Sequence, residues 1–214
     1  MVKSVWFATV LLALIPAAVS ATEVGLVTAV SGNVKWQEAG AVASELKPFV
    51  KVREGDQVLM ETASRLQVVY FESGRQETWQ GAGTLEVGND SSKVVKGGLQ
   101  PEIRTLPAIL VRQLAKTPSP DGSVKTGMVR MRSLVPIDRL ESVEREYAEM
   151  RRQADASDRN PELYLLASYF ELREFDKLEA LLGRMNAKSP AATDLTALNV
   201  LYYRAISAAR SAGK

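Results

Sequence analysis

The spacing of apolar residues changes once along this chain of 214 residues, and this change constrains the fold more than any other feature. From residue 24 to residue 95, short segments rich in Val, Thr, Tyr, Phe and Trp are separated by turns of Gly, Asn, Asp or Ser, which predicts β-strands. From residue 136 onward, apolar residues recur every three or four positions, which predicts amphipathic helices. We therefore expect an α+β protein: an N-terminal all-β module, built as a sandwich or a short solenoid, followed by an array of four antiparallel helices.

Residues 1–21 have the three parts of a secretory signal peptide. Lys3 supplies the positive charge, "VWFATVLLALI" forms a short apolar run, and Val19 and Ala21 are small residues at the cleavage positions. The run is too short to span a bilayer as a finished helix, although an uncleaved N-terminal anchor is the alternative. We expect a periplasmic protein whose mature chain starts near Thr22 and has no transmembrane segment.

The chain contains no cysteine and no histidine. This composition excludes a cysteine nucleophile, a Ser-His-Asp triad and the usual zinc sites. The glycine-rich stretches "GAG" and "KGG" lack the spacing of phosphate-binding loops, and no EF-hand pattern occurs. The net charge of +2 gives no reason to expect binding to nucleic acid. We predict no catalytic residue, no cofactor and no metal site.

Residues 96–135 are expected to connect the two halves. The loop "KTPSPDGS" at 116–123 precedes "VKTGMVRMRSLV", which predicts an additional strand. Nine Lys or Arg residues and three acidic residues lie between Lys93 and Arg139. One interpretation is a solvated basic linker. The other is a contact with an anionic partner (a lipid head group, a cell-wall polymer or an acidic protein), for which Arg130 and Arg132 are the candidate residues.

The β-rich half resembles the FecR-like family of exported domains. The resemblance covers about residues 24–95 and runs through "GLVTAVSGNVKW", "VREGDQVLMETASRLQVVYFESGRQETW" and "TLEVG". Gly25, Gly32, Gly55-Asp56 and Thr62 match the order of turns in that family, whereas Ser73-Gly74 replaces its usual Asp-Gly turn. The resemblance implies a periplasmic module that binds a ligand or a protein.

The helical half, residues 136–214, is similar to a divergent tetratricopeptide-type hairpin. In "LYLLASYFELREFDKLEALLGRMNAKSP" the large residues Leu165, Tyr169 and Leu182 fit that repeat. Leu166 and Leu178 depart from it, because the repeat has small side chains there. A plain helical bundle is the alternative, since a single weak repeat does not establish a superhelix.

The Gly55-Asp56 step and the segment "RLQVVYF" of the β half are predicted to have structural roles. Gly55-Asp56 is predicted to form a bend rather than a catalytic or metal-binding site, because glycine permits a tight turn and aspartate accepts hydrogen bonds from the amides around it. In "RLQVVYF", Leu66, Val68 and Tyr70 share one face, while Gln67, Val69 and Phe71 share the other. Because both faces carry apolar residues, we expect this strand to be central in its sheet.

Two further residues are candidates for an interaction surface. Trp79 lies in the otherwise polar segment "RQETWQGAG", where a tryptophan suits an interface. Glu171 lies off the apolar stripe of helix 161–172, as do Glu162 and Ser168, so these three are expected to be exposed. Tyr169 and Leu182 are expected in the interior of the helical hairpin.

Together these features predict a binding or scaffold protein of the cell envelope that performs no catalysis. Its partner would be a protein of the envelope or a cell-wall polymer. Two rival hypotheses are an enzyme that cleaves cell-wall glycan with paired carboxylates, and a structural subunit of an envelope assembly.

Overall fold

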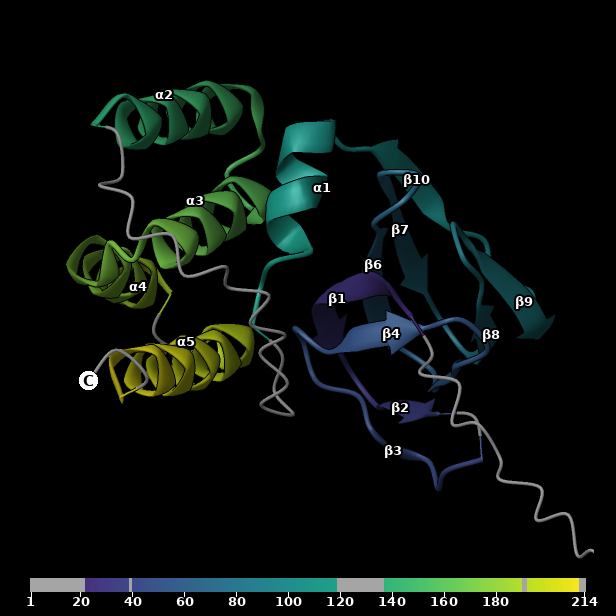
Figure 1. Cartoon of the computed structure of the whole chain (residues 1–214). Coiled ribbons are helices and arrows are strands. Elements are labelled where there is room, and N and C mark those ends of the chain that lie inside the picture. Colours follow the sequence, from purple (N-terminus) through teal and green to yellow (C-terminus); the bar gives the residue numbers. More distant parts are fainter. Residues whose placement is uncertain (1–21, 39, 119–136, 190–191, 212–214) are drawn as a thin grey trace, which may run out of the picture.

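The computed structural model describes residues 22–38, 40–118, 137–189 and 192–211, and within them the protein is α+β. The β-strands all precede the long helices, as expected from the change in period (Figure 1). The strands are β1 Glu23–Ser31, β2 Val34–Gln37, β3 Ser44–Glu45, β4 Lys51–Arg53, β5 Gln57–Met60, β6 Arg65–Tyr70, β7 Arg75–Gln80, β8 Gly83–Val87, β9 Ser92–Lys96 and β10 Glu102–Thr105. The helices are α1 Ala108–Leu114, α2 Ile137–Gln153, α3 Asn160–Leu172, α4 Phe175–Lys188 and α5 Thr193–Ser211.

The strands form two antiparallel sheets that enclose an apolar core. Sheet A has the order β10-β7-β6-β1-β4, and sheet B has the order β3-β2-β5-β8-β9. Val68 and Trp79 of sheet A belong to the same buried cluster as Val58 and Leu85 of sheet B. A cluster shared by the two inner faces is the defining property of a β-sandwich.

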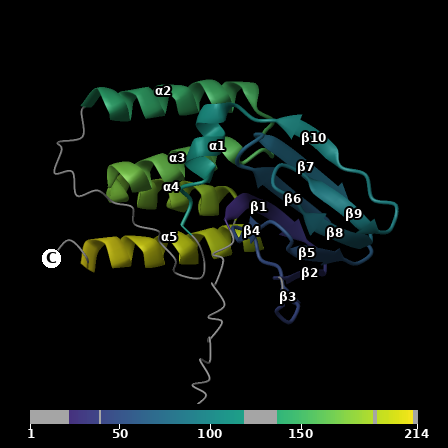
Figure 2. The same ribbon diagram turned by 45° about the vertical axis from the view of Figure 1, so that its right-hand side comes forward.

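Strand β6 lies in the middle of sheet A and is covered on both faces, as its two apolar faces predicted. Leu66, Val68 and Tyr70 pack into the sandwich core, whereas Val69 and Phe71 pack against the helical half. Sheet A is therefore the central layer of the molecule, with sheet B on one side and the helices on the other (Figure 2).

The Gly55-Asp56 step is a bend between β4 and β5, as predicted. Gly55 has a φ of 86°, a backbone conformation that side chains disfavour. The Asp56 carboxylate accepts hydrogen bonds from the backbone N–H of Arg53 and from Trp36 Nε1, both at 2.9 Å. With its side chain only 2% exposed, Asp56 serves to hold the turn and the Trp36 ring in place.

The helical half contains four successive helices, α2 to α5, and neighbouring helices run in opposite directions (Figure 2). Helix α3 contacts α1, α2 and α4, and it is buried on nearly every face. Its last turn ends at Arg173, which adopts the left-handed conformation with a φ of 61° and starts the short connection to α4. Tyr169 and Leu182 are buried in this half, as predicted.

One continuous apolar core joins the two halves. Leu26 and Val69 of sheet A and Leu114 of α1 belong to the same cluster as Leu166 and Leu182 of the helical half. Helix α1 lies between the sheets and the helices (Figure 1). The expected connecting segment thus contributes to both halves, because β10 extends sheet A beyond residue 95 and α1 fills the junction. The expected strand in residues 124–135 lies outside the described residues.

Candidate functional site

The outer face of sheet A, which is turned toward the helices, divides into an apolar part and a polar part. The apolar part carries Leu26 and Val69 and belongs to the joint core. The polar part carries Gln67 on β6 and Gln76 and Thr78 on β7. Both Gln76 and Thr78 are buried, at 3% and 7% exposure. Polar residues in the middle of a covered sheet are unusual, because burial of polar groups is costly unless they are hydrogen-bonded.

These polar side chains form the floor of a cavity of about 330 Å³ between the two halves, which we call the polar cleft. Its opposite wall comes from the connection between α2 and α3 and from the first turn of α5, and β10 forms one rim. The charged residues that line it are Arg65, Glu102, Arg104, Asp155, Asp158, Arg159 and Asp194. Its volume is within the range of small-ligand sites, roughly 300–1,000 Å³.

The floor is a chain of hydrogen bonds with one unsatisfied member. Thr28 Oγ1 donates to Gln67 Oε1 at 2.8 Å, and Gln67 Nε2 donates to Thr78 Oγ1 at 3.2 Å. Gln76 Nε2 is buried and has no hydrogen-bond partner among the described residues. A buried donor without an acceptor destabilises the fold by about 1–3 kcal/mol. The unsatisfied Gln76 amide therefore lowers the stability of the folded protein unless a ligand supplies the missing acceptor.

Ion pairs at the rim connect the two halves. Arg104 Nη2 lies 3.1 Å from Glu102 Oε1, and Arg104 Nη1 lies 3.8 Å from Asp155 Oδ2 across the cleft. Arg159 Nη1 lies 2.6 Å from Asp194 Oδ2, which ties the start of α3 to the start of α5. The Arg104 and Asp155 side chains are 54% and 74% exposed, so their contact is worth little and a ligand can replace it.

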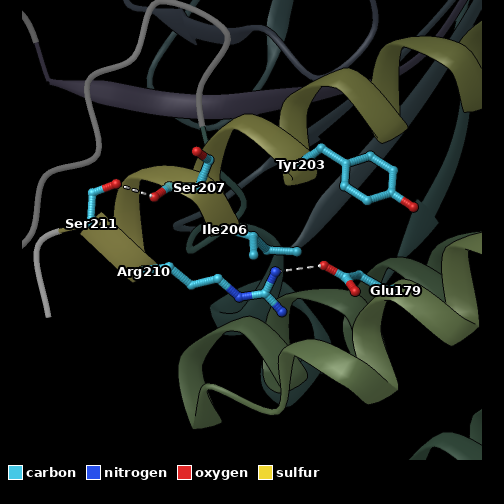
Figure 3. Close-up of a pocket in the computed structure, with 6 residues that line it drawn as sticks. All are labelled: Glu179, Tyr203, Ile206, Ser207, Arg210 and Ser211. Atoms are coloured by element: carbon cyan, nitrogen blue, oxygen red, sulfur yellow. Dashed lines mark hydrogen bonds and ion pairs between the residues drawn. The ribbon is translucent and has the colours of Figure 1, made fainter. Parts of the chain in front are cut away.

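A second hollow lies between α4 and α5 (Figure 3). It has a volume of about 320 Å³ and is lined by Tyr203, Ile206 and Ser207, among others. Arg210 crosses it, with Nη1 3.2 Å from Glu179 Oε1. The residues that line this hollow include no buried polar group without a partner, which distinguishes it from the polar cleft.

The prediction that Trp79 lies at an interaction surface is wrong. Trp79 is 2% exposed and packs in the sandwich core. Its polar surroundings in the sequence misled the prediction, because Glu77, two residues earlier on the same face, is also completely buried. Trp79 Nε1 donates to Glu77 Oε2 at 3.0 Å, and Arg75 Nε donates to Glu77 Oε1 at 2.6 Å. The indole N–H thus helps to satisfy a buried carboxylate.

The prediction that Glu162, Ser168 and Glu171 are exposed is confirmed for Glu171 alone, because Glu162 is half-buried and Ser168 is buried. Ser168 is fully buried, and its hydroxyl donates to the Tyr164 carbonyl at 2.8 Å. Glu162 pairs with Arg151 at 3.0 Å. Neighbouring elements cover α3 on both sides of its apolar stripe, and a single helical period does not reveal such additional neighbours.

Glu171 connects three helical segments. Its carboxylate lies 2.8 Å from Lys116 Nζ and 2.9 Å from Arg139 Nη2, and Gln113 Nε2 donates to it at 3.3 Å. Burial tends to raise the pKa of Glu171, but the hydrogen bond and charge of Lys116, with Gln113 and Arg139, outweigh burial and lower the pKa below its usual value. The candidate residues Arg130 and Arg132 lie outside the described residues.

We predict that Glu171→Lys lowers the free energy of unfolding by about 1 kcal/mol, since it places a third cation beside Lys116 and Arg139. Because the folded-state pKa of Glu171 is lowered, its contribution is present above the usual pKa of 4.5 and is lost as the pH falls through the lower folded-state value. Urea titrations of the parent and Glu171→Lys at neutral and acidic pH test this. The difference should shrink at acidic pH, and an unchanged difference would contradict the ion-pair assignment.

No family model, no curated protein and no solved structure matches this chain. Within the described ranges, no helix is both long and apolar enough to cross a membrane. The same residues contain no group of three or more acidic side chains placed to hold a metal ion.

The sequence did not identify Gln76 or Arg104 as cleft residues, although it carried a signal for Gln76. In the segment "RQETW", Gln76 and Thr78 lie on one face of the strand, and Glu77 and Trp79 lie on the other. Placed beside Gln67 of a central strand, this alternation could have indicated a polar patch on a covered face. What the sequence lacked was the register that sets Gln67 opposite Thr78.

Proposed function

We propose that this protein is a non-catalytic binding protein of the cell envelope that holds a small ligand in the polar cleft. The observation that carries the proposal is the buried Gln76 amide without a partner at the base of that cleft. A buried group that lowers the stability of the free protein has a physical explanation if a ligand supplies the missing hydrogen-bond acceptor. The resemblance of the β half to FecR-like domains supports the same class of function.

Export is part of the proposal and has a separate test. The pattern of residues 1–21 favours removal of a leader, so N-terminal sequencing of the protein from the envelope fraction should begin at Thr22 or within about two residues of it. Recovery of the intact Met1 terminus from membranes would instead support the uncleaved anchor.

Binding can be tested by native mass spectrometry of the purified mature protein incubated with a small-molecule extract of the cell envelope. We expect a bound species with the parent and at least a tenfold loss of it with Gln76→Leu. The matched control is Gln80→Leu, on the same strand but exposed and outside the cleft, which should bind as the parent does. Equal binding by Gln76→Leu would remove the polar cleft as the binding site.

One observation supports the rival hypothesis of a glycan-cleaving enzyme: four carboxylates line the cleft, namely Glu102, Asp155, Asp158 and Asp194. Glycoside hydrolysis needs one carboxylic acid free to protonate the leaving oxygen. Here Glu102 and Asp194 lie in ion pairs with Arg104 and Arg159, and Asp158 Oδ1 accepts the Asn160 N–H at 2.9 Å. Asp155 has only the 3.8 Å contact with Arg104, but the mechanism needs a second carboxylate to act with it. These contacts favour a binding role for the cleft over catalysis by paired carboxylates. The ligand released from the protein should therefore be chemically unchanged, whereas a cleaved product would support the enzyme.

A further inference from the structure

We propose that the ligand of the polar cleft is a small zwitterion with a free carboxylate and a free ammonium group, such as a short peptide with unblocked ends. This inference rests on the proposed binding function. It follows from the donors on the sheet wall, the carboxylates on the helical wall and the balance of charge between them.

The sheet wall offers donors that suit a carboxylate. Arg104 of β10 lies directly opposite Gln76 of β7 in the strand register, so the two side chains are neighbours on one face of sheet A. Gln76 Nε2 lacks an acceptor, and the Arg104 side chain, which donates to Glu102 Oε1 from Nε and Nη2, is 54% exposed. A carboxylate placed there would accept the amide N–H and a charge-assisted hydrogen bond from arginine, which is the stronger kind.

The helical wall offers carboxylates that suit an ammonium group. Asp155 and Asp158 line the cleft from the connection between α2 and α3. The separation between Asp155 Oδ2 and Arg104 Nη1 is 3.8 Å, longer than a hydrogen bond. A zwitterion that lies across the cleft would place its carboxylate at Arg104 and its ammonium group at Asp155, replacing one weak contact by two closer ones.

The charge balance disfavours strongly charged ligands. Three arginines and four carboxylates line the cleft, so its net charge is close to zero, and neither a polyanion nor a polycation is favoured. Both walls are mainly polar, with Ala29, Val30 and Leu163 as apolar exceptions, and an apolar ligand would leave the polar groups unsatisfied. A neutral molecule with opposite charges at its two ends fits this lining best.

Isothermal titration calorimetry with the mature protein and the dipeptide alanyl-alanine tests the assignment. N-acetyl-alanyl-alanine lacks the ammonium group, alanyl-alanine amide lacks the carboxylate, and each should bind at least tenfold more weakly than the free dipeptide. Alanine distinguishes a free amino acid from a peptide as the source of the zwitterion. Trehalose serves as an uncharged probe with many hydroxyl groups and should not bind.

Two variants assign the ends of the ligand. Asp155→Asn should weaken binding of alanyl-alanine at least tenfold but leave the weak binding of its N-acetyl form unchanged, so that the two probes become equal. Gln76→Leu should weaken binding of the free dipeptide at least tenfold, while its unfolding midpoint stays the same or rises, because an apolar side chain replaces an unsatisfied amide. The Gln80→Leu control should match the parent in both measurements.

The outcomes separate this inference from the proposed function. Three outcomes would overturn the zwitterion: equal affinity for free and blocked dipeptides, preference for trehalose, or no binding of any probe at millimolar concentration. The proposed binding function would then still be decided by the mass-spectrometric experiment. Full-strength binding of alanyl-alanine by Gln76→Leu would overturn both, because the polar cleft would then not be the site.

Discussion

Replacing Trp79 by alanine is expected to lower the free energy of unfolding by about 3–5 kcal/mol, the usual cost of deleting a large aromatic side chain from a core. Two effects add. The sandwich loses an indole that is 2% exposed, and the Glu77 carboxylate loses the hydrogen bond from Trp79 Nε1 at 3.0 Å. Guanidinium titration followed by circular dichroism measures the change.

The variant Trp79→Phe separates these two effects. It keeps an aromatic ring in the core but removes the N–H donor, so it should cost about 1–3 kcal/mol, the penalty for a buried polar group that loses a partner. The exposed residue Val42, at 91% exposure, provides the control, and Val42→Ala should stay within about 0.5 kcal/mol of the parent. If Trp79→Ala unfolded at the parental midpoint but lost binding, the interface role originally expected for Trp79 would be restored.

Leu114→Ala is expected to lower the free energy of unfolding by about 2–5 kcal/mol and to destabilise both halves at once. Leu114 is completely buried and lies in the core that joins sheet A to α3 and α4. The halves can be followed separately: within the described residues tryptophan occurs at positions 36 and 79, both in the β half, and the helical signal in circular dichroism comes mainly from α2 to α5. Both signals should shift together in a single transition.

The control for Leu114 is Val200→Ala on α5, where the side chain is 56% exposed and a change within about 0.5 kcal/mol is expected. A fluorescence transition that stays at the parental midpoint while the helical signal shifts would show that the halves unfold independently. Such a result would support two separate modules joined by a linker, in place of the single joint core.

The two walls of the polar cleft come from different halves of the molecule. The floor of the cleft belongs to the β half, whereas Asp155 and Asp194 belong to the helical half. A ligand that contacts both walls adds contacts across the junction and so stabilises the assembled form over separated halves. Binding and the joint unfolding transition are therefore expected to be linked, with the transition moving upward as ligand is added.

The sequence alone determined the local structure of this protein. The period of two in "RLQVVYF" placed a central strand, the period of three to four after residue 136 placed four helices, and Gly55-Asp56 placed a turn. Each is a local property, because the spacing of side chains along a strand or helix follows from backbone geometry.

Only the tertiary structure decided which faces are covered and by what. Alternation shows that Trp79 and Gln76 lie on opposite faces of β7, but not that sheet B covers the first and the helical half covers the second. Likewise, the stripe on α3 could not show that further elements would bury Ser168. The polar cleft exists because packing of the joint core brings Asp155 and Asp194 over the floor formed by Gln67, Gln76 and Thr78. Contacts between residues so distant in the chain depend on how whole layers pack, and no local pattern records them.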